Sequence, residues 1–213
     1  MIIKRKWKPV LTAVLAVAVI FASGCNGKAE SGNDGKGETS ESVRDDVSVL
    51  ENGTLEGNVF SSRWADYAIT FPEETEFWSE DDLREQEKRI KESNPALEVF
   101  KYDFAAVVYK EDIFELTYEG IPEDSTLESY VKETEESLGE AGYTIVEKGR
   151  KELGGREYSF VTSEMKMVEV SFGYDYYIRQ VDDTYMCLTV FYRMNDKDRI
   201  QEILGTMRPW EKR

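Results

Sequence analysis

The chain has 213 residues, 40% hydrophobic and 12% aromatic, which is enough for one globular domain with a packed core. Its formal net charge of −16, from 27 basic and 43 acidic residues, disfavours binding to nucleic acids. The sequence contains no histidine, which excludes Ser-His-Asp and Cys-His catalysis and histidine-ligated zinc.

Residues 1–24 are typical of an export signal peptide. Basic residues near the start precede an uncharged, largely apolar run from Pro9 to Ala22, which is shorter than the roughly 20 residues needed to span a bilayer. This segment has four bases and no acid, so the remaining chain holds 23 bases against 43 acids and a net charge of −20.

The segment Ala22-Ser23-Gly24-Cys25 resembles the bacterial lipobox, although the usual pattern has leucine at the position of Ala22. The resemblance implies cleavage between Gly24 and Cys25 and a diacylglycerol thioether on Cys25. Two or three acyl chains on one residue hold a protein stably at a bilayer. We therefore expect a lipoprotein at the outer face of the bacterial cytoplasmic membrane. The alternative is an ordinary secretory signal followed by a coincidental cysteine.

Residues 25–57 are rich in glycine and small polar or acidic residues and show no apolar periodicity. We expect a flexible acidic linker whose ends lie about 30 Å apart on average. Asn33-Asp34-Gly35 is similar to part of a calcium loop, but the repeated acidic ligands and the closing glutamate are missing, so we predict no metal site. A single globular domain is then expected over residues 58–213.

The first predicted elements of this domain are a strand and a helix. Alternation of aromatic and apolar residues over 64–71 predicts the strand. Ser79 and Asp82 have the spacing of an N-cap and its partner and predict a helix from Glu80 to Ser93. Because this helix has few apolar residues, we expect it to be largely solvated and to cover an edge or face of the sheet.

A hairpin and a second helix are predicted next. Segments 100–109 and 113–118 have strand character and flank a polar turn at 110–112. Ser125 and Glu128 have the spacing of a capping box at the start of an amphipathic helix. The apolar stripe of that helix comprises Leu127, Tyr130, Val131, Thr134 and Leu138.

The rest of the domain predicts mostly strands. Segment 143–147 is one, and Gly154-Gly155 predicts a hairpin turn into a strand over 156–163. Alternation over 167–180 predicts a long strand, in which Gly173 is expected to form a bulge.

The chain ends with a strand and a helix. Segment 185–192 alternates, and Asn195 is expected to cap the final helix. The core face of this helix comprises Ile200, Ile203, Leu204 and Met207. The order of elements predicts an α+β fold, a mostly antiparallel meandering sheet with about three helices packed on it.

Several short segments of this order resemble the PsbP-like superfamily. They are Tyr67-Ala-Ile-Thr-Phe-Pro72 followed by Trp78, the acidic loop and capped helix from Pro122 to Val131, Gly154-Gly155-Arg-Glu-Tyr158, and the terminal amphipathic helix. The resemblance covers residues 58–210. It implies an α/β/α sandwich with binding or assembly roles, and it implies no shared catalytic residue and no cofactor.

The remaining candidates for chemistry each have a simpler interpretation. Cys187 lies in the middle of a strand and is expected to be a buried thiol, without a disulfide partner if Cys25 is lipidated. Paired carboxylates such as Asp182-Asp183 are frequent in so acidic a chain and are favoured in turns, so none is predicted to be catalytic. We expect a non-enzymatic protein.

The aromatic residues of the late strands are the candidate binding surface. Tyr177 and Arg179 alternate with Tyr176 and Ile178 and so point to the opposite face of the sheet. Ordinary strand packing is one interpretation. The other is a partly exposed surface that docks a partner or a glycan. The residues assigned to it are Tyr174, Tyr177, Arg179 and Tyr185.

These observations lead to one expected function and two alternatives. We expect a monomeric lipoprotein that binds a protein or glycan of the cell envelope through its sheet face or its hairpin tips. The first alternative is a small-molecule or glycan carrier with a pocket between sheet and helix. The second is a hydrolase that uses carboxylates alone, which would require a cleft of clustered acids with raised pKa values.

Overall fold

The computed structural model describes residues 50–211 except 95–96, 98 and 122–124. The predicted signal peptide, the cleavage and lipidation sites at Gly24 and Cys25, and most of the predicted linker lie outside the described residues.

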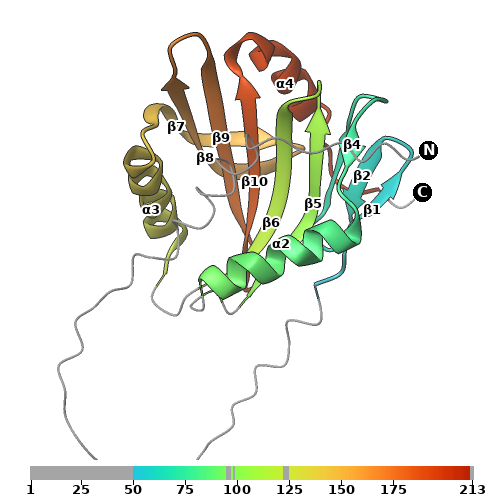
Figure 1. Ribbon diagram of the computed structural model, residues 1–213. Coiled ribbons are helices and arrows are strands. Elements are labelled where there is room, and N and C mark those ends of the chain that lie inside the picture. Colours follow the sequence, from blue (N-terminus) through green and yellow to red (C-terminus); the bar gives the residue numbers. More distant parts are fainter. Residues whose placement is uncertain (1–49, 95–96, 98, 122–124, 212–213) are drawn as a thin grey trace, which may run out of the picture.

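The main sheet has seven antiparallel strands in the order β4-β5-β6-β10-β9-β8-β7 (Figure 1). Its strands are β4 (Glu76–Phe77), β5 (Phe100–Val108), β6 (Asp112–Gly120), β7 (Thr144–Leu153), β8 (Arg156–Lys166), β9 (Ser171–Val181) and β10 (Thr184–Arg193). A second sheet has three antiparallel strands, β1 (Thr54–Glu56), β2 (Val59–Ser62) and β3 (Tyr67–Thr70).

Helices α2 (Glu80–Ser93) and α3 (Leu127–Glu140) cover one face of the main sheet (Figure 1). The three-stranded sheet and α4 (Lys197–Leu204), which follows the 3-10 turn η2 (Met194–Asp196), cover the other face. The expected α+β class, with an antiparallel sheet and helices packed on it, is confirmed. The small sheet that forms part of the second covering layer was not foreseen.

Helix α2 has the predicted bounds and the predicted cap. The Ser79 side chain accepts from the Asp82 backbone N–H, and the Asp82 side chain bonds back to Ser79. The helix buries Ile90 against Phe100 and Tyr102 of β5, and otherwise depends on exposed ion pairs along its surface. Ile90 is the one buried residue of the helix, and Leu83 packs beside it partly buried, so the helix is largely solvated.

A bulge in β5 sends its two halves to opposite layers. The register between β5 and β6 shifts between Tyr102 and Phe104, so one extra residue, Asp103, is inserted. Phe100 and Tyr102 pack under α2, whereas Phe104, Ala106 and Val108 join the core under the small sheet. One strand thereby contributes aromatic side chains to both layers.

The folded region begins earlier than predicted. Strand β1 lies inside the segment expected to be linker and pairs with β2 through Leu55↔Phe60. The predicted strand over 64–71 is shorter, because Trp64 to Asp66 form a turn in which Asp66 has φ +50°. Strands of three or four residues give too little alternation to be recognised in a polar sequence.

The predicted caps of two helices are wrong. Thr126, with Ser129, caps α3 in place of Ser125 and Glu128. Asp196 precedes α4, and the expected cap by Asn195 does not form, because Asn195 lies within η2. These errors are shifts of one residue at helix ends, where several polar residues compete for the same role.

The segment predicted as one strand over 167–180 contains a turn. Residues 167–170 connect β8 to β9, closed by Met167 N–H donating to the Val170 carbonyl at 2.9 Å. Gly173 is not a bulge, since the register on both sides of it is continuous. Instead the Tyr192 ring lies over Gly173, in space that a Cβ atom would occupy.

Candidate functional site

The predicted surface of Tyr174, Tyr177, Arg179 and Tyr185 does not form. The three tyrosines are 2%, 1% and 1% exposed respectively, so their expected partial exposure is wrong. Tyr174 and Tyr185 pack on the α3 side, and Tyr177 packs in the core of the opposite layer. Both faces of β9 and β10 are covered by other elements. Side chains that alternate along these strands therefore enter one buried cluster or the other, and neither face is exposed.

The α3 side of the sheet holds a buried polar cluster. The Tyr130 hydroxyl donates to Glu119 Oε2 at 2.7 Å and lies 3.4 Å from Cys187 Sγ. Burial raises the pKa of Glu119 to about 6 and raises the pKa of the Cys187 thiol well above its usual value. The expectation that Cys187 is a buried thiol is confirmed, and its raised pKa disfavours the reactive thiolate.

Glu115 is a second buried carboxyl on the same face of β6. It is 6% exposed, and burial raises its pKa to about 7. Glu115 and Glu119 are four residues apart on one strand, which places them about 13 Å apart along it. A glycosidase pair needs roughly 5 to 9.5 Å between its carboxyls, so these two do not form such a pair.

Two buried carboxyls on the other face are held by tyrosine hydroxyls. Asp103 accepts from Tyr67 and Tyr118, both at 2.8 Å. Asp175 accepts from Tyr177 at 3.2 Å and Tyr192 at 3.3 Å. Burial raises the pKa of both carboxyls despite these bonds. Both carboxyls accept hydrogen bonds from side chains of the core, so we assign them a role in stabilising the core.

Arg179, the fourth predicted residue, belongs to a different group of side chains. Four segments distant in sequence converge there, namely the β2–β3 turn, the start of β8, the end of β9 and the C-terminal segment. We call this group the Arg/Trp corner. It comprises Arg63, Trp64, Asp66, Arg156, Tyr158, Arg179, Asp182, Arg208 and Trp210.

Direct contacts join the segments of the corner. Arg156 Nε donates to Asp66 Oδ2 at 3.1 Å, and the Trp210 backbone N–H donates to Asp66 Oδ1 at 3.1 Å. Arg179 Nε donates to the Tyr158 hydroxyl at 3.1 Å. The Arg156 hydrogen bond holds the pKa of Asp66 below its usual value, against the opposing effect of burial.

The tryptophans and the remaining arginines complete the corner. Trp64 Nε1–H donates to Asp182 at 3.0 Å, and the Arg63 guanidinium lies 5.7 Å from the centre of the Trp210 ring. Arg208 pairs with Ala68 through backbone hydrogen bonds, which leaves its guanidinium outside the strand ladder. Within the described part of the chain, Arg63, Arg179 and Arg208 form no ion pair with a carboxylate.

A second surface feature is the turn between β8 and β9, which we call the hairpin tip (residues 167–170). Met167, Val168 and Val170 are 62%, 102% and 39% exposed. Turns usually hold glycine, asparagine or aspartate, so three exposed aliphatic residues are unusual there. This turn was not predicted, because methionine and valine are residue types common in strands.

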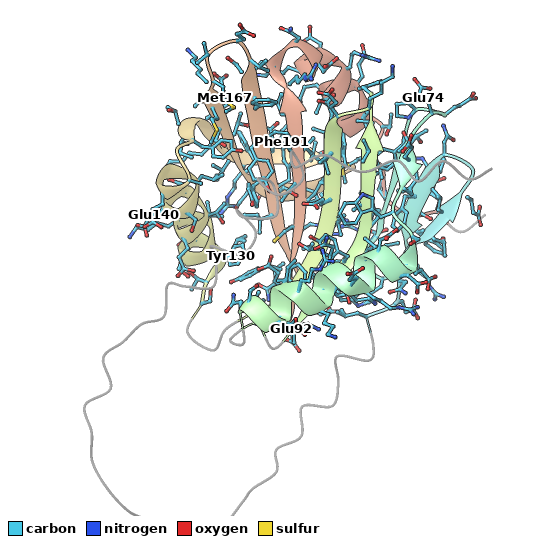
Figure 2. The ribbon with its side chains drawn as sticks, viewed as in Figure 1. Glu74, Glu92, Tyr130, Glu140, Met167 and Phe191 are labelled. Atoms are coloured by element: carbon cyan, nitrogen blue, oxygen red, sulfur yellow. The ribbon has the colours of Figure 1, made fainter. Side chains whose placement is uncertain are left out.

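The hairpin tip and the Arg/Trp corner lie at opposite ends of the main sheet. Arg179 is eight residues along β9 from Ser171, where the strand leaves the tip. This separation corresponds to about 27 Å. Figure 2 shows Met167 at the end of the sheet away from Glu92 of α2.

No group of three or more cysteine, aspartate or glutamate side chains that could hold a metal ion occurs among the described residues. The helices that the structure describes include none long and apolar enough to cross a membrane.

No family model matches the sequence, and no curated protein matches it. Solved structures similar to this chain include cyanobacterial PsbP (CyanoP) from Synechocystis sp. PCC 6803, with 10% identity and a TM-score of 0.47 over 75% of this chain and 96% of that one. Another is LpqN of Mycobacterium tuberculosis, a protein involved in cell envelope biogenesis, with 8% identity and a TM-score of 0.42 over 68% of this chain and 83% of that one. At these values the similarity carries no conclusion about the family or the function of this chain.

Proposed function

We propose that this chain is a non-catalytic binding protein, held by a lipid on Cys25 at the outer face of a bacterial cytoplasmic membrane. In this proposal the folded domain docks a protein of the cell envelope through the hairpin tip. The lipobox resemblance and the polar segment that follows it support the anchor and the tether. The exposed apolar side chains of the tip support the docking role and are the observation that carries it.

The tip has the composition of a docking element. Val168 is fully exposed at the end of the hairpin, and Met167 and Val170 flank it. Exposed aliphatic surface has a free-energy cost in water, and a partner that covers it recovers about 25 cal/mol for each Å² buried. A methionine beside two valines can adapt to the shape of an apolar socket.

Charges near the tip indicate the chemistry of the partner. Glu164 and Glu169 lie on the hairpin itself, with Lys166 between them, and α3, which ends beside Met165 of β8, is rich in glutamate. The glutamates of α3 are Glu128, Glu133, Glu135, Glu136 and Glu140, against one basic residue, Lys132. Glu140 and Met167 lie on the same side of the molecule in Figure 2. An apolar socket bordered by lysine and arginine would match this surface.

The position of the tether is consistent with this role. The first described residue, Leu50, accepts a hydrogen bond from Lys101 Nζ at 2.6 Å. Lys101 lies in the cross-strand row that continues through Tyr118 and Met186 to Arg179. The chain therefore enters the domain at the corner end of the sheet. A domain tethered there presents its hairpin tip away from the point of attachment.

Photo-crosslinking in cells tests the docking role. A photoreactive residue at position 168 should capture one protein, and the same residue at position 55 should not. Leu55 is the matched control, since it is an aliphatic residue with 44% exposure on the other sheet. Val168→Glu should abolish capture from a probe at 167, whereas Leu55→Glu should preserve it. Equal products from positions 168 and 55 would contradict the proposal.

A further inference from the structure

The Arg/Trp corner lies at the tethered end of an otherwise acidic domain, and we infer that it binds the phosphate groups of phospholipid headgroups in the anchoring membrane. This inference rests on the proposed lipid anchor. It adds a second, electrostatic contact with the bilayer, which would orient the domain.

The guanidinium groups of the corner are chemically suited to phosphate. Arg63, Arg179 and Arg208 have no carboxylate partner within the described chain, so their charge is not neutralised in place. Arginine binds phosphate through two parallel N–H donors, and a weakly hydrated guanidinium loses little on transfer to an interface. Arg63 is exposed, and Arg208 is half-buried, so both are accessible to a ligand.

The tryptophans of the corner are also suited to the headgroup region of a membrane. Trp64 and Trp210 are half-buried, with an apolar ring and a polar N–H that fit the headgroup region of a bilayer. The Trp64 N–H is already bonded to Asp182, and the Trp210 ring lies beside Arg63. Arginine next to tryptophan can bury its stem while its charge stays at the headgroup level.

The local charge differs in sign from that of the chain. The exported part has a net charge of −20, and an anionic membrane would repel it as a whole. The corner holds four arginines against two aspartates, because Arg156 pairs with Asp66 and Asp182 offsets one of the charges of Arg63, Arg179 and Arg208. The lowered pKa of Asp66, to which Arg156 and then Arg179 contribute, is consistent with a positive local field.

The location of the Arg/Trp corner near the tether favours the bilayer as the source of the phosphate groups. Leu50 is bonded to Lys101, which shares a cross-strand row with Arg179, so the tether and the corner share an end of the sheet. Anchoring through Cys25 concentrates lipid headgroups near that end, and a contact made there is effectively intramolecular. A weak site for single headgroups therefore suffices to hold the corner at the surface.

Arginine-specific chemical modification tests the inference on the lipidated full chain in vesicles. Vesicles of phosphatidylcholine alone are compared with vesicles that also contain phosphatidylglycerol, and mass spectrometry reports the rate at each arginine. We expect modification of Arg63 and Arg208 to slow by at least about five-fold with phosphatidylglycerol, the gain associated with one basic residue at an anionic surface. Arg193, at the other end of β10, should react equally on both. Salt at about 1 M should remove the protection.

Matched variants separate the corner from general charge. Arg63→Gln/Arg208→Gln should leave Arg156 and Arg179 unprotected on anionic vesicles. Lys110→Gln/Lys166→Gln removes the same charge from exposed sites at the other end of the sheet and should preserve protection. Equal rates at Arg63, Arg208 and Arg193 on both vesicles would overturn the inference.

Two further outcomes distinguish the alternatives. Protection by soluble glycerol phosphate on phosphatidylcholine vesicles, equal to that by phosphatidylglycerol, would overturn the membrane source in favour of a free phosphate ligand. Failure of the lipidated chain to float with phosphatidylcholine vesicles would contradict the anchor itself, and hence the proposed function, whatever the arginine rates.

Discussion

The Tyr118 hydroxyl donates to Asp103 Oδ2 at 2.8 Å, across the bulge that divides β5. Tyr67 of the small sheet donates to the same oxygen at 2.8 Å, and the Gly53 N–H donates to the other at 2.7 Å. One carboxylate thereby joins the small sheet, the main sheet and the segment before β1. The bulge keeps Phe104 in the same layer as Asp103, whereas a regular strand would have placed Phe104 under α2.

We expect substitution of the acceptor, Asp103, to lower the free energy of unfolding more than substitution of one of its donors. Asp103→Ala leaves two buried tyrosine hydroxyls without their acceptor and should lower the free energy of unfolding by about 3 kcal/mol. Tyr67→Phe removes one donor and should cost about 1 kcal/mol. Urea unfolding of the two variants measures both values. Equal losses would show that Asp103 is not the shared acceptor in solution.

The cap of α3 leads us to expect different losses of stability on substitution of the neighbouring residues Thr126 and Ser125. Thr126→Ala removes the side chain that accepts from the Ser129 N–H and should destabilise the protein by about 1 kcal/mol. Ser125→Ala removes the residue that the sequence favoured as cap and should cost a few tenths of a kcal/mol. Thermal unfolding of both variants checks the order, and a larger loss for Ser125→Ala would contradict the observed cap.

Two glycines predict effects of opposite sign. A Cβ atom at Gly173 would lie 2.3 Å from the Tyr192 ring, so Gly173→Ala should cost about 1 to 3 kcal/mol through overpacking. At Gly139 in α3 a Cβ atom meets nothing within 4 Å, so Gly139→Ala should stabilise the protein by about 0.5 to 1 kcal/mol. Urea unfolding measures both free energies. A higher free energy of unfolding for Gly173→Ala than for the parent protein would contradict the packing of Tyr192 over this residue.

Glu115 predicts how stability depends on pH. Its pKa is about 7 when folded, against an ordinary value of 4.5, so between these values the folded protein holds a proton that the unfolded chain releases. The free energy of unfolding should therefore fall as pH rises from about 4.5 to 7, by on the order of 3 kcal/mol. Glu119, with a raised pKa of about 6, acts in the same direction.

The matched variants for this pH dependence are Glu115→Gln and Glu157→Gln. Unfolding titrations from pH 4 to 8 should show a smaller slope for Glu115→Gln. Glu157 is exposed, so its variant should keep the slope of the parent protein. A Glu115→Gln slope equal to that of the parent would contradict the assigned burial of this carboxyl.

Elements with strong local signals could be predicted from the sequence. The start of α2 follows from its capping box, and the turn at Gly154-Gly155 follows from two residues that adopt φ of +59° and +72°. The core face of α4 follows from its helical spacing. In each case a short stretch of chain contains the whole physical reason for the structure.

Features that depend on distant contacts could not be predicted. The burial of Tyr174, Tyr177 and Tyr185 requires covering layers on both faces of the sheet, and one of these includes a small sheet of short strands. The Arg/Trp corner needs four segments to meet, and of its members the sequence indicated Arg179. The hairpin tip lacked the usual turn residues, so alternation alone predicted a continuous strand.

Anchoring through Cys25 is the central claim, and fractionation of cells that express Cys25→Ala tests it most directly. The parent chain should be found in the membrane fraction and should partition into detergent as a lipidated protein. The variant should either leave the membrane after cleavage or accumulate uncleaved with its signal peptide attached. Unchanged processing and unchanged membrane association of Cys25→Ala would contradict the account.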